Sequence, residues 1–161
     1  MAHRPAVTSE GRTVELGRLT LGSGEAKRLD VPLGADELTI GGEQYTRERG
    51  ALSRLEVSRT VSGYALRLRY AADLTGPCTR CLEEARITVD VDAREVDQPG
   101  AGDDEMRSPY VSGDELDVAT WAHDALVLAL PTKLLCRPDC AGLCPVCGEC
   151  LNDAGLVKHN H

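Results

Sequence analysis

The chain has 161 residues, of which 26 are acidic and 18 basic, so its formal net charge is −8. With 42% hydrophobic and 27% charged residues, it has the composition of one folded domain rather than of a disordered chain. It contains no Phe, one Trp and four Tyr, which predicts an aliphatic core. The excess of acid excludes a protein held on nucleic acid by its overall charge, so any RNA contact must be local.

The sequence shows neither a signal peptide nor a membrane span. Its N-terminus lacks the apolar run of about 7–15 residues of a signal peptide, and no run approaches the about 20 residues of a membrane helix. We therefore expect a cytoplasmic protein. Seven is an odd number of cysteines, and the cytosol is reducing, so clustered thiols are expected to bind metal or act in redox chemistry rather than form disulfides.

The first two thirds of the chain is predicted to be β-structure. Residues 12–45 alternate weakly between apolar and polar and contain Gly-rich breaks, which predicts short strands joined by turns. Residues 52–70 predict a hairpin with Arg67 and Arg69 on its solvated side. Residues 86–93 alternate strictly and predict a further strand.

The last third is predicted to hold a loop, a helix and a cysteine-rich segment. Residues 97–113 are rich in Pro, Gly and acid and predict a mobile acidic loop. Residues 116–130 carry an apolar stripe of helical period, capped by Asp114 or Asp117 and ended by Pro131. This helix is apolar enough to pack across the sheet.

The predicted fold class is therefore α+β. An antiparallel β-rich domain with one main helix spans residues 1–131, and a zinc-binding segment over residues 132–161 is clamped to it. Residues 136–150 hold five cysteines in a composition too rich in Pro and Gly to build an apolar core, so this segment needs a metal to order it.

Six cysteines form three close pairs. Two residues separate the members of two pairs, which lets a turn direct both thiolates at one ion about 2.3 Å from each sulfur. The third pair has three intervening residues, still within the range of zinc sites. With two histidines near the end of the chain, the candidate zinc ligands are Cys78, Cys81, Cys136, Cys140, Cys144, Cys147, His159 and His161.

We expect two zinc ions. In the preferred arrangement, Cys78 and Cys81 share one ion with Cys136 and Cys140, and the second Cys-x-x-Cys pair closes a smaller site with the two histidines. One open alternative is a single site made of the last two cysteine pairs. A second alternative is that a Cys-x-x-Cys pair carries out redox chemistry. A third is that the two histidines belong to a solvated tail and bind no metal. Cys150 is a spare thiol or a substitute ligand.

No motif of an enzyme is present. The sequence contains no Walker loop, no dinucleotide-binding glycine motif, no nucleophile elbow and no zinc-protease motif. His123 lies next to Asp124, but no nucleophile is placed to join them. We therefore do not expect catalysis.

Three stretches together resemble a known family. They are Cys78-Thr-Arg-Cys81-Leu82, the helix end Leu128-Ala129-Leu130-Pro131, and the cysteine-rich run from Cys136 to Gly148 followed by Leu151-Asn152. Over residues 76–152 they closely resemble the YceD-like family of bacteria and plastids, the large ribosomal RNA subunit accumulation proteins, whereas only the strand pattern agrees before that. The resemblance implies a role in 23S rRNA accumulation and large-subunit assembly, and a gene often found beside that of a zinc-ribbon ribosomal protein.

The resemblance also bears on the ligands. Relatives without the distal cysteines tend to keep the pair matching Cys78 and Cys81, with His or Cys at the third pair, which implies that these two pairs form one site. Many relatives have a Cys-x-Cys or His-x-His where His159-Asn160-His161 stands. This chain departs from the pattern at Cys150 and lacks the Asp-Pro-Arg segment expected after the last ligands.

The predicted function is that of a non-enzymatic zinc-binding factor for 23S rRNA accumulation or large-subunit assembly. Its partner would be large-subunit rRNA or a pre-ribosomal particle, bound through a local group of arginines that includes Arg67, Arg69 and Arg80. The alternative is a protein-interaction or zinc-handling module that serves a zinc-ribbon protein of the large subunit and does not contact RNA.

Overall fold

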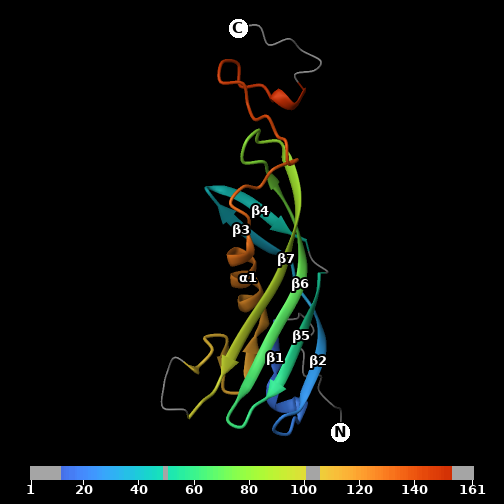
Figure 1. Cartoon of the computed structure of the whole chain (residues 1–161), viewed down its shortest axis with the longest axis vertical. Coiled ribbons are helices and arrows are strands. Elements are labelled where there is room, and N and C mark those ends of the chain that lie inside the picture. The colour runs from blue at the N-terminus through green and yellow to red at the C-terminus, as the bar shows by residue number, and fades with distance from the viewer. Residues whose placement is uncertain (1–11, 49–50, 101–105, 154–161) are drawn as a thin grey trace.

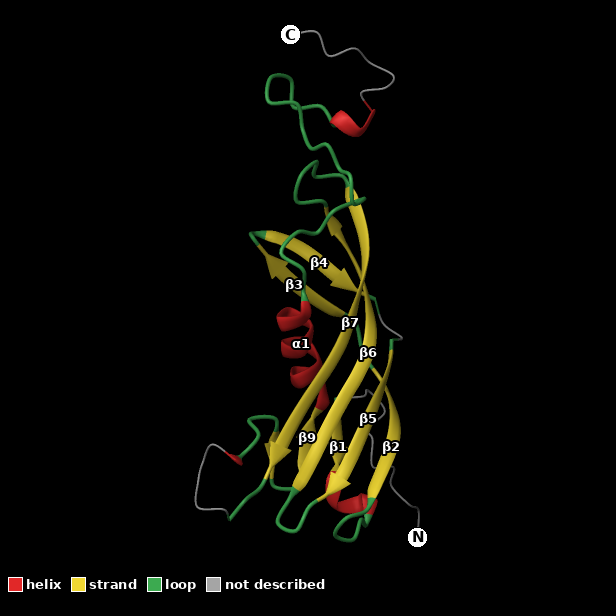
Figure 2. Ribbon diagram, viewed as in Figure 1, coloured by secondary structure: helices red, strands yellow, loops and turns green. Residues whose placement is uncertain are grey.

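The computed structural model describes residues 12–48, 51–100 and 106–153, and these form antiparallel β-sheets with one α-helix (Figures 1 and 2). The α+β prediction is therefore confirmed. In chain order the elements are β1 (Thr13–Glu15), η1 (Leu16–Leu19), β2 (Ala26–Pro32), β3 (Asp36–Ile40), β4 (Glu43–Arg47), β5 (Leu52–Arg59), β6 (Tyr64–Pro77), β7 (Glu84–Asp97), β8 (Val111–Ser112), β9 (Glu115–Asp117), α1 (Val118–Ala129) and η3 (Leu151–Asp153).

The main sheet has six strands and is built around β6. Strand β5 pairs with the first half of β6, and β4 pairs with its last residues, so the two strands share one edge of β6. Strand β7 covers the other edge along all 14 residues of β6. Strands β2 and β3 complete the sheet outside β5 and β4. The long β6–β7 hairpin therefore forms the spine of an elongated molecule (Figure 1).

The predicted hairpin and helix are both present. Alternate residues of β6 are buried from Tyr64 to Leu74, and the residues between them lie on the outer face, as a period of two requires. The predicted 86–93 strand is the middle of β7. Helix α1 begins after Asp117, whose side chain accepts a hydrogen bond from the Thr120 N–H, so Asp117 is the cap.

One aliphatic core joins the sheets to the helix. Trp121 and Leu126 of α1 are almost fully buried together with Leu55 and Leu68 of the main sheet. The Tyr70 hydroxyl donates to the Ala122 carbonyl oxygen at 2.6 Å, which fixes the helix against the sheet. No helix among the described residues is long and apolar enough to cross a membrane.

Two stretches differ from the sequence prediction. Residues Leu16–Leu19 form the short helix η1 instead of a strand. Within the predicted loop 97–113, Asp97 ends β7 and Val111–Ser112 forms β8, which pairs with β9, whereas residues 101–105 lie outside the described residues. The buried Asp97 carboxylate accepts hydrogen bonds from the Ser108 N–H and the Arg107 guanidinium. These bonds hold the chain that leads to β8 against the end of β7. The sequence did not predict these contacts of Asp97, because one acidic residue in a stretch rich in Pro and Gly produces no periodic pattern.

Candidate metal centre

The first cysteine pair lies at the turn of the β6–β7 hairpin. Cys78 follows β6 directly, and its N–H donates to the Glu83 carbonyl oxygen, so the six residues between the strands close a tight loop. Leu82 takes a left-handed conformation, with φ of 64°, which a non-glycine residue adopts only when its surroundings enforce it. Both thiols are buried, Cys78 completely.

The loop is held in place by Tyr45 of β4. The Tyr45 hydroxyl donates to the Pro77 carbonyl oxygen at 2.6 Å, one residue before Cys78. Gly76 leaves the space for this contact, since a Cβ atom on it would lie 2.2 Å from the Tyr45 ring. The sheet therefore fixes the direction in which the first cysteine pair points.

The second half of the cluster comes from the segment after α1. Leu134 is buried, and its carbonyl oxygen accepts a hydrogen bond from the Thr79 N–H at 2.8 Å. Arg80 donates from its guanidinium to the Cys140 carbonyl oxygen at 2.9 Å. These two bonds join the segment to the hairpin loop on either side of Cys136 and bring the second pair against the first.

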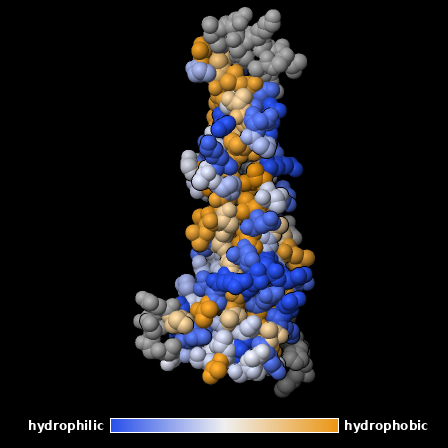
Figure 3. Space-filling model, viewed as in Figure 1, coloured by the Kyte–Doolittle hydropathy of each residue, from blue (hydrophilic) through white to orange (hydrophobic). Residues whose placement is uncertain are grey.

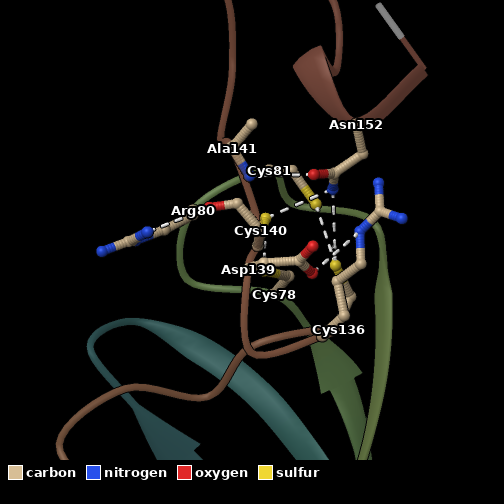
Figure 4. Close-up of polar contacts among 9 residues, drawn as sticks. Cys78, Arg80, Cys81, Cys136, Asp139, Cys140, Ala141 and Asn152 are labelled. Atoms are coloured by element: carbon tan, nitrogen blue, oxygen red, sulfur yellow. Dashed lines mark hydrogen bonds and ion pairs between the residues drawn. The ribbon is translucent and has the colours of Figure 1, made fainter. Parts of the chain in front are cut away.

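The four sulfur atoms of Cys78, Cys81, Cys136 and Cys140 face one another (Figure 4). All four lie within 4.8 Å of one another, with Cys78 Sγ 3.7 Å from Cys140 Sγ and Cys81 Sγ 3.6 Å from Cys136 Sγ. Four sulfurs at about 2.3 Å from a tetrahedral zinc ion are about 3.8 Å apart. A disulfide requires about 2.05 Å. The arrangement therefore fits a four-coordinate metal ion and not a pair of disulfides.

The electrostatics of the cluster favour a cation. Burial opposes ionisation of Cys78, but backbone N–H groups of the surrounding turns outweigh it and lower the pKa of this thiol to about 6. The Asn152 amide lowers the pKa of Cys140, whereas burial raises the pKa of Cys81 and of Cys136. Four thiolates packed in a poorly solvated site repel one another, and a divalent ion removes that penalty by binding them.

The sequence-predicted pairing is the one that the structure brings together. The alternative site made of the last two cysteine pairs is not formed, because Cys136 and Cys140 face the hairpin loop. Among the described residues no second group of three or more metal-binding side chains occurs. His159 and His161 lie outside the described residues.

Cys144 and Cys147 form a separate turn beyond the cluster. The Gly148 N–H donates to the Cys144 carbonyl oxygen, the Cys144 N–H donates to the Glu149 carbonyl oxygen, and Gly148 has φ of 76°. This left-handed glycine after the second cysteine is the feature expected of a metal-binding turn. Cys144 is buried and Cys147 is exposed. We call residues 141–153 the distal segment.

The three predicted nucleic-acid-binding arginines all have partners. Arg67 makes two hydrogen bonds to the Asp92 carboxylate, at 2.9 and 2.8 Å. Arg69 pairs with Glu56 at 2.8 Å, and Arg80 is committed to the Cys140 carbonyl oxygen. The structure thus places Arg67 and Arg69 on the outer sheet face, as predicted, and Arg80 beside the metal centre.

Two residues besides the four clustered cysteines belong to the centre: Asn152, for which no role was predicted, and Cys150, which was predicted to be a spare thiol or a substitute ligand. Asn152 donates to the sulfurs of Cys140 and Cys136, at 3.3 and 3.6 Å. Cys150 packs against the four-cysteine cluster and pairs with Leu143 through a backbone bridge. The Leu-Asn dipeptide after the cysteines was the available signal for Asn152, but spacing alone does not reveal which way an amide points.

Comparison with known proteins agrees with this architecture. The family profile described as large ribosomal RNA subunit accumulation protein YceD matches residues 66–160. Uncharacterized proteins of Mycobacterium bovis and Mycobacterium tuberculosis are 35% identical over 129 residues, which cover 76% of this chain and 61% of theirs. The chain thus spans less than two thirds of the length of these relatives. No solved structure matches it. The matched region contains nearly all of the β6–β7 hairpin, the helix and all seven cysteines, and the chain belongs to the YceD family.

Proposed function

We propose that this chain is a non-enzymatic zinc-binding factor that supports accumulation of 23S rRNA during assembly of the large ribosomal subunit. The observation that carries the proposal is the buried four-cysteine cluster, which joins the hairpin loop to the segment after the helix. A closed all-cysteine site has no open coordination position, so it suits a structural ion and not a catalytic one. The family description names rRNA accumulation and no catalytic role.

Zinc is the metal that fits best. It accepts four thiolates in tetrahedral geometry without redox chemistry. The first ion would bind Cys78, Cys81, Cys136 and Cys140. A second would bind Cys144 and Cys147 together with His159 and His161, and the metal-binding turn at Gly148 supports that half of the site.

A test in cells addresses the role in rRNA accumulation. Deleting the gene is expected to lower the ratio of 23S to 16S rRNA, and the wild-type chain is expected to restore it. The double variant Cys78→Ser with Cys81→Ser is expected not to restore it, because half of the zinc ligands are lost. An unchanged ratio in the deletion strain, measured by quantitative electrophoresis of total RNA, would overturn the proposal.

Direct RNA contact is proposed for the outer face of the main sheet. Figure 3 shows hydrophilic residues gathered over this part of the molecule. Arg54 lies opposite Arg69 in the sheet, and Arg94 lies opposite Arg67. Arg54 and Arg94 are exposed and form no ion pair among the residues that the structure describes, unlike Arg67 and Arg69. They are the cations of this face that are best placed to meet phosphate groups.

Replacing both unpaired arginines tests this contact. Arg54→Glu with Arg94→Glu is expected to weaken binding to 23S rRNA fragments and to lower the slope of log affinity against log salt by about 2, one for each phosphate contact. Lys27→Glu with Lys133→Glu is the control, because it makes the same change in net charge at two exposed residues outside this face: Lys27 lies opposite the buried Val57, and Lys133 follows α1. Equal affinity of the two double variants, measured by filter binding over a salt series, would contradict direct contact through this face.

A second candidate function is docking onto a protein of the large subunit. The net charge of −8 favours a partner that is itself basic, as many rRNA-binding proteins are. In this case the chain would bind no isolated rRNA at physiological salt but would copurify with a ribosomal protein. The salt series above distinguishes the two candidates, because only the RNA-binding chain gives a measurable slope.

A further inference from the structure

The side chain of Asn152 reaches the metal centre from the distal segment. Its Nδ2 atom lies 3.3 Å from Cys140 Sγ and 3.6 Å from Cys136 Sγ, so one amide group spans two of the four sulfurs (Figure 4). Its Oδ1 atom accepts the Ala141 N–H at 2.8 Å. Every polar atom of this amide is therefore committed to the centre or to the backbone next to it.

The backbone around Asn152 is built to hold this position. The Leu151 N–H donates to the Gly142 carbonyl oxygen at 2.8 Å, and Leu143 and Cys150 form an antiparallel bridge. Gly142 has φ of 84° and lies against Arg80 of the hairpin loop. The distal segment thus folds back on itself and delivers Asn152 to the second cysteine pair, which lies 12 and 16 residues earlier in the chain.

An amide N–H next to a metal thiolate has a defined chemical effect. It donates to the sulfur lone pairs that the metal does not use, and so stabilises the negative charge without competing for the metal. Outer hydrogen bonds of this kind orient the ligands, and their removal typically costs about 10–100-fold in metal affinity. Cys140 already has its backbone carbonyl held by Arg80, so Asn152 completes the outer shell of this ligand.

We propose that Asn152 is a positioning residue of the metal centre: its amide holds Cys136 and Cys140 in the binding geometry and makes metal retention depend on the folding of the distal segment. The inference rests on the proposed zinc function and adds to it a coupling between metal retention and the folding of the distal segment. When the distal segment unfolds, both N–H···S bonds are lost, and the cluster releases its ion faster.

Two substitutions separate this role from a purely structural one. Asn152→Asp keeps an oxygen that accepts the Ala141 N–H, but it places a negative oxygen against two sulfurs. Asn152→Leu removes both the donor and the acceptor without adding charge. If Asn152 acts through the sulfurs, the aspartate variant is the more damaging. If it only ties the backbone at Ala141, the leucine variant is the more damaging.

The test measures zinc release from the full chain into a chromogenic chelator. We expect release to be about 10-fold faster in Asn152→Leu and up to about 100-fold faster in Asn152→Asp. In cobalt-substituted protein, the sulfur-to-metal charge-transfer band is expected to shift in both variants. Gln44→Glu is the charge-matched control on the exposed β3–β4 hairpin, and fluorescence of the single, buried Trp121 checks that the core remains folded.

The outcomes separate the inference from the function on which it rests. Release from Asn152→Asp at the wild-type rate, with an unshifted cobalt band, would overturn the role of Asn152 and leave the zinc function intact. A wild-type chain that holds no zinc would overturn both.

Discussion

Removing the metal is expected to release residues 132–153 from the hairpin loop while the sheets and the helix stay folded. The core around Trp121 contains no cysteine, whereas the four clustered cysteines form a separate and much smaller buried cluster whose apolar partners are Ala85, Leu135 and Leu143. In small zinc folds the ion supplies about 10–16 kcal/mol at neutral pH. Without it, the segment is tied to the rest of the chain only by the buried Leu134 and by few hydrogen bonds, and these do not offset the entropy gained when the residues after Leu134 are released.

Hydrogen exchange measures this directly. After chelation, the amides of Cys78, Thr79 and Cys140 are expected to lose protection. The Cys78 bond closes the hairpin loop, the Thr79 bond joins the loop to the segment, and the Cys140 N–H donates to the Arg137 carbonyl oxygen in a turn within the segment. Amides in the centre of β6 serve as the internal control and are expected to stay protected. Unchanged protection at Thr79 in the chelated protein would show that the metal does not clamp the segment.

Replacing Gly76 by alanine is expected to lower the free energy of unfolding by about 3 kcal/mol, the upper end of the usual cost of overpacking. The added Cβ would lie 2.2 Å from a ring carbon of Tyr45. Tyr45 is buried and held by its bond to the Pro77 carbonyl oxygen, so its ring cannot turn away without losing that bond. The displacement would reach Cys78, which lies two residues after Gly76.

Thermal unfolding of Gly76→Ala and Gly34→Ala provides a matched comparison. A Cβ on Gly34 meets no atom within 4 Å, so this variant is expected to melt close to the wild type. For a chain of this size, about 3 kcal/mol corresponds to a melting temperature roughly 6–12 °C lower. Equal melting temperatures for the two variants would mean that the contact of Gly76 with Tyr45 does not constrain the fold.

Local patterns predicted most of the fold. The period of two identified strands in residues 52–70 and 86–93, because one face of each strand is buried. The helix was identified by its own apolar stripe. The sequence did not reveal that β6 and β7 form one hairpin with the first cysteine pair as its turn. Strand pairing is a long-range property, and in this chain it depends on buried contacts such as those of Tyr45 and Tyr70.

The candidate site was predictable as a set of residues but not as a set of interactions. Thiol spacing limited the possible ligand groups, and the resemblance to the family favoured the pairing that the structure contains. The partners of Arg67 and Arg69 were not predictable, because Asp92 and Glu56 lie on neighbouring strands whose register sequence alone does not fix. Asn152 was missed for the same reason, since its contacts depend on how the distal segment folds back.

The central claim is that one ion is shared between the hairpin loop and the segment that follows the helix. Native mass spectrometry of the intact chain and of Cys78→Ser with Cys81→Ser tests it most directly. We expect the double variant to hold one zinc fewer than the wild type, which is expected to hold two. The same number of zinc ions in both proteins would show that Cys78 and Cys81 bind no metal and would contradict the shared site.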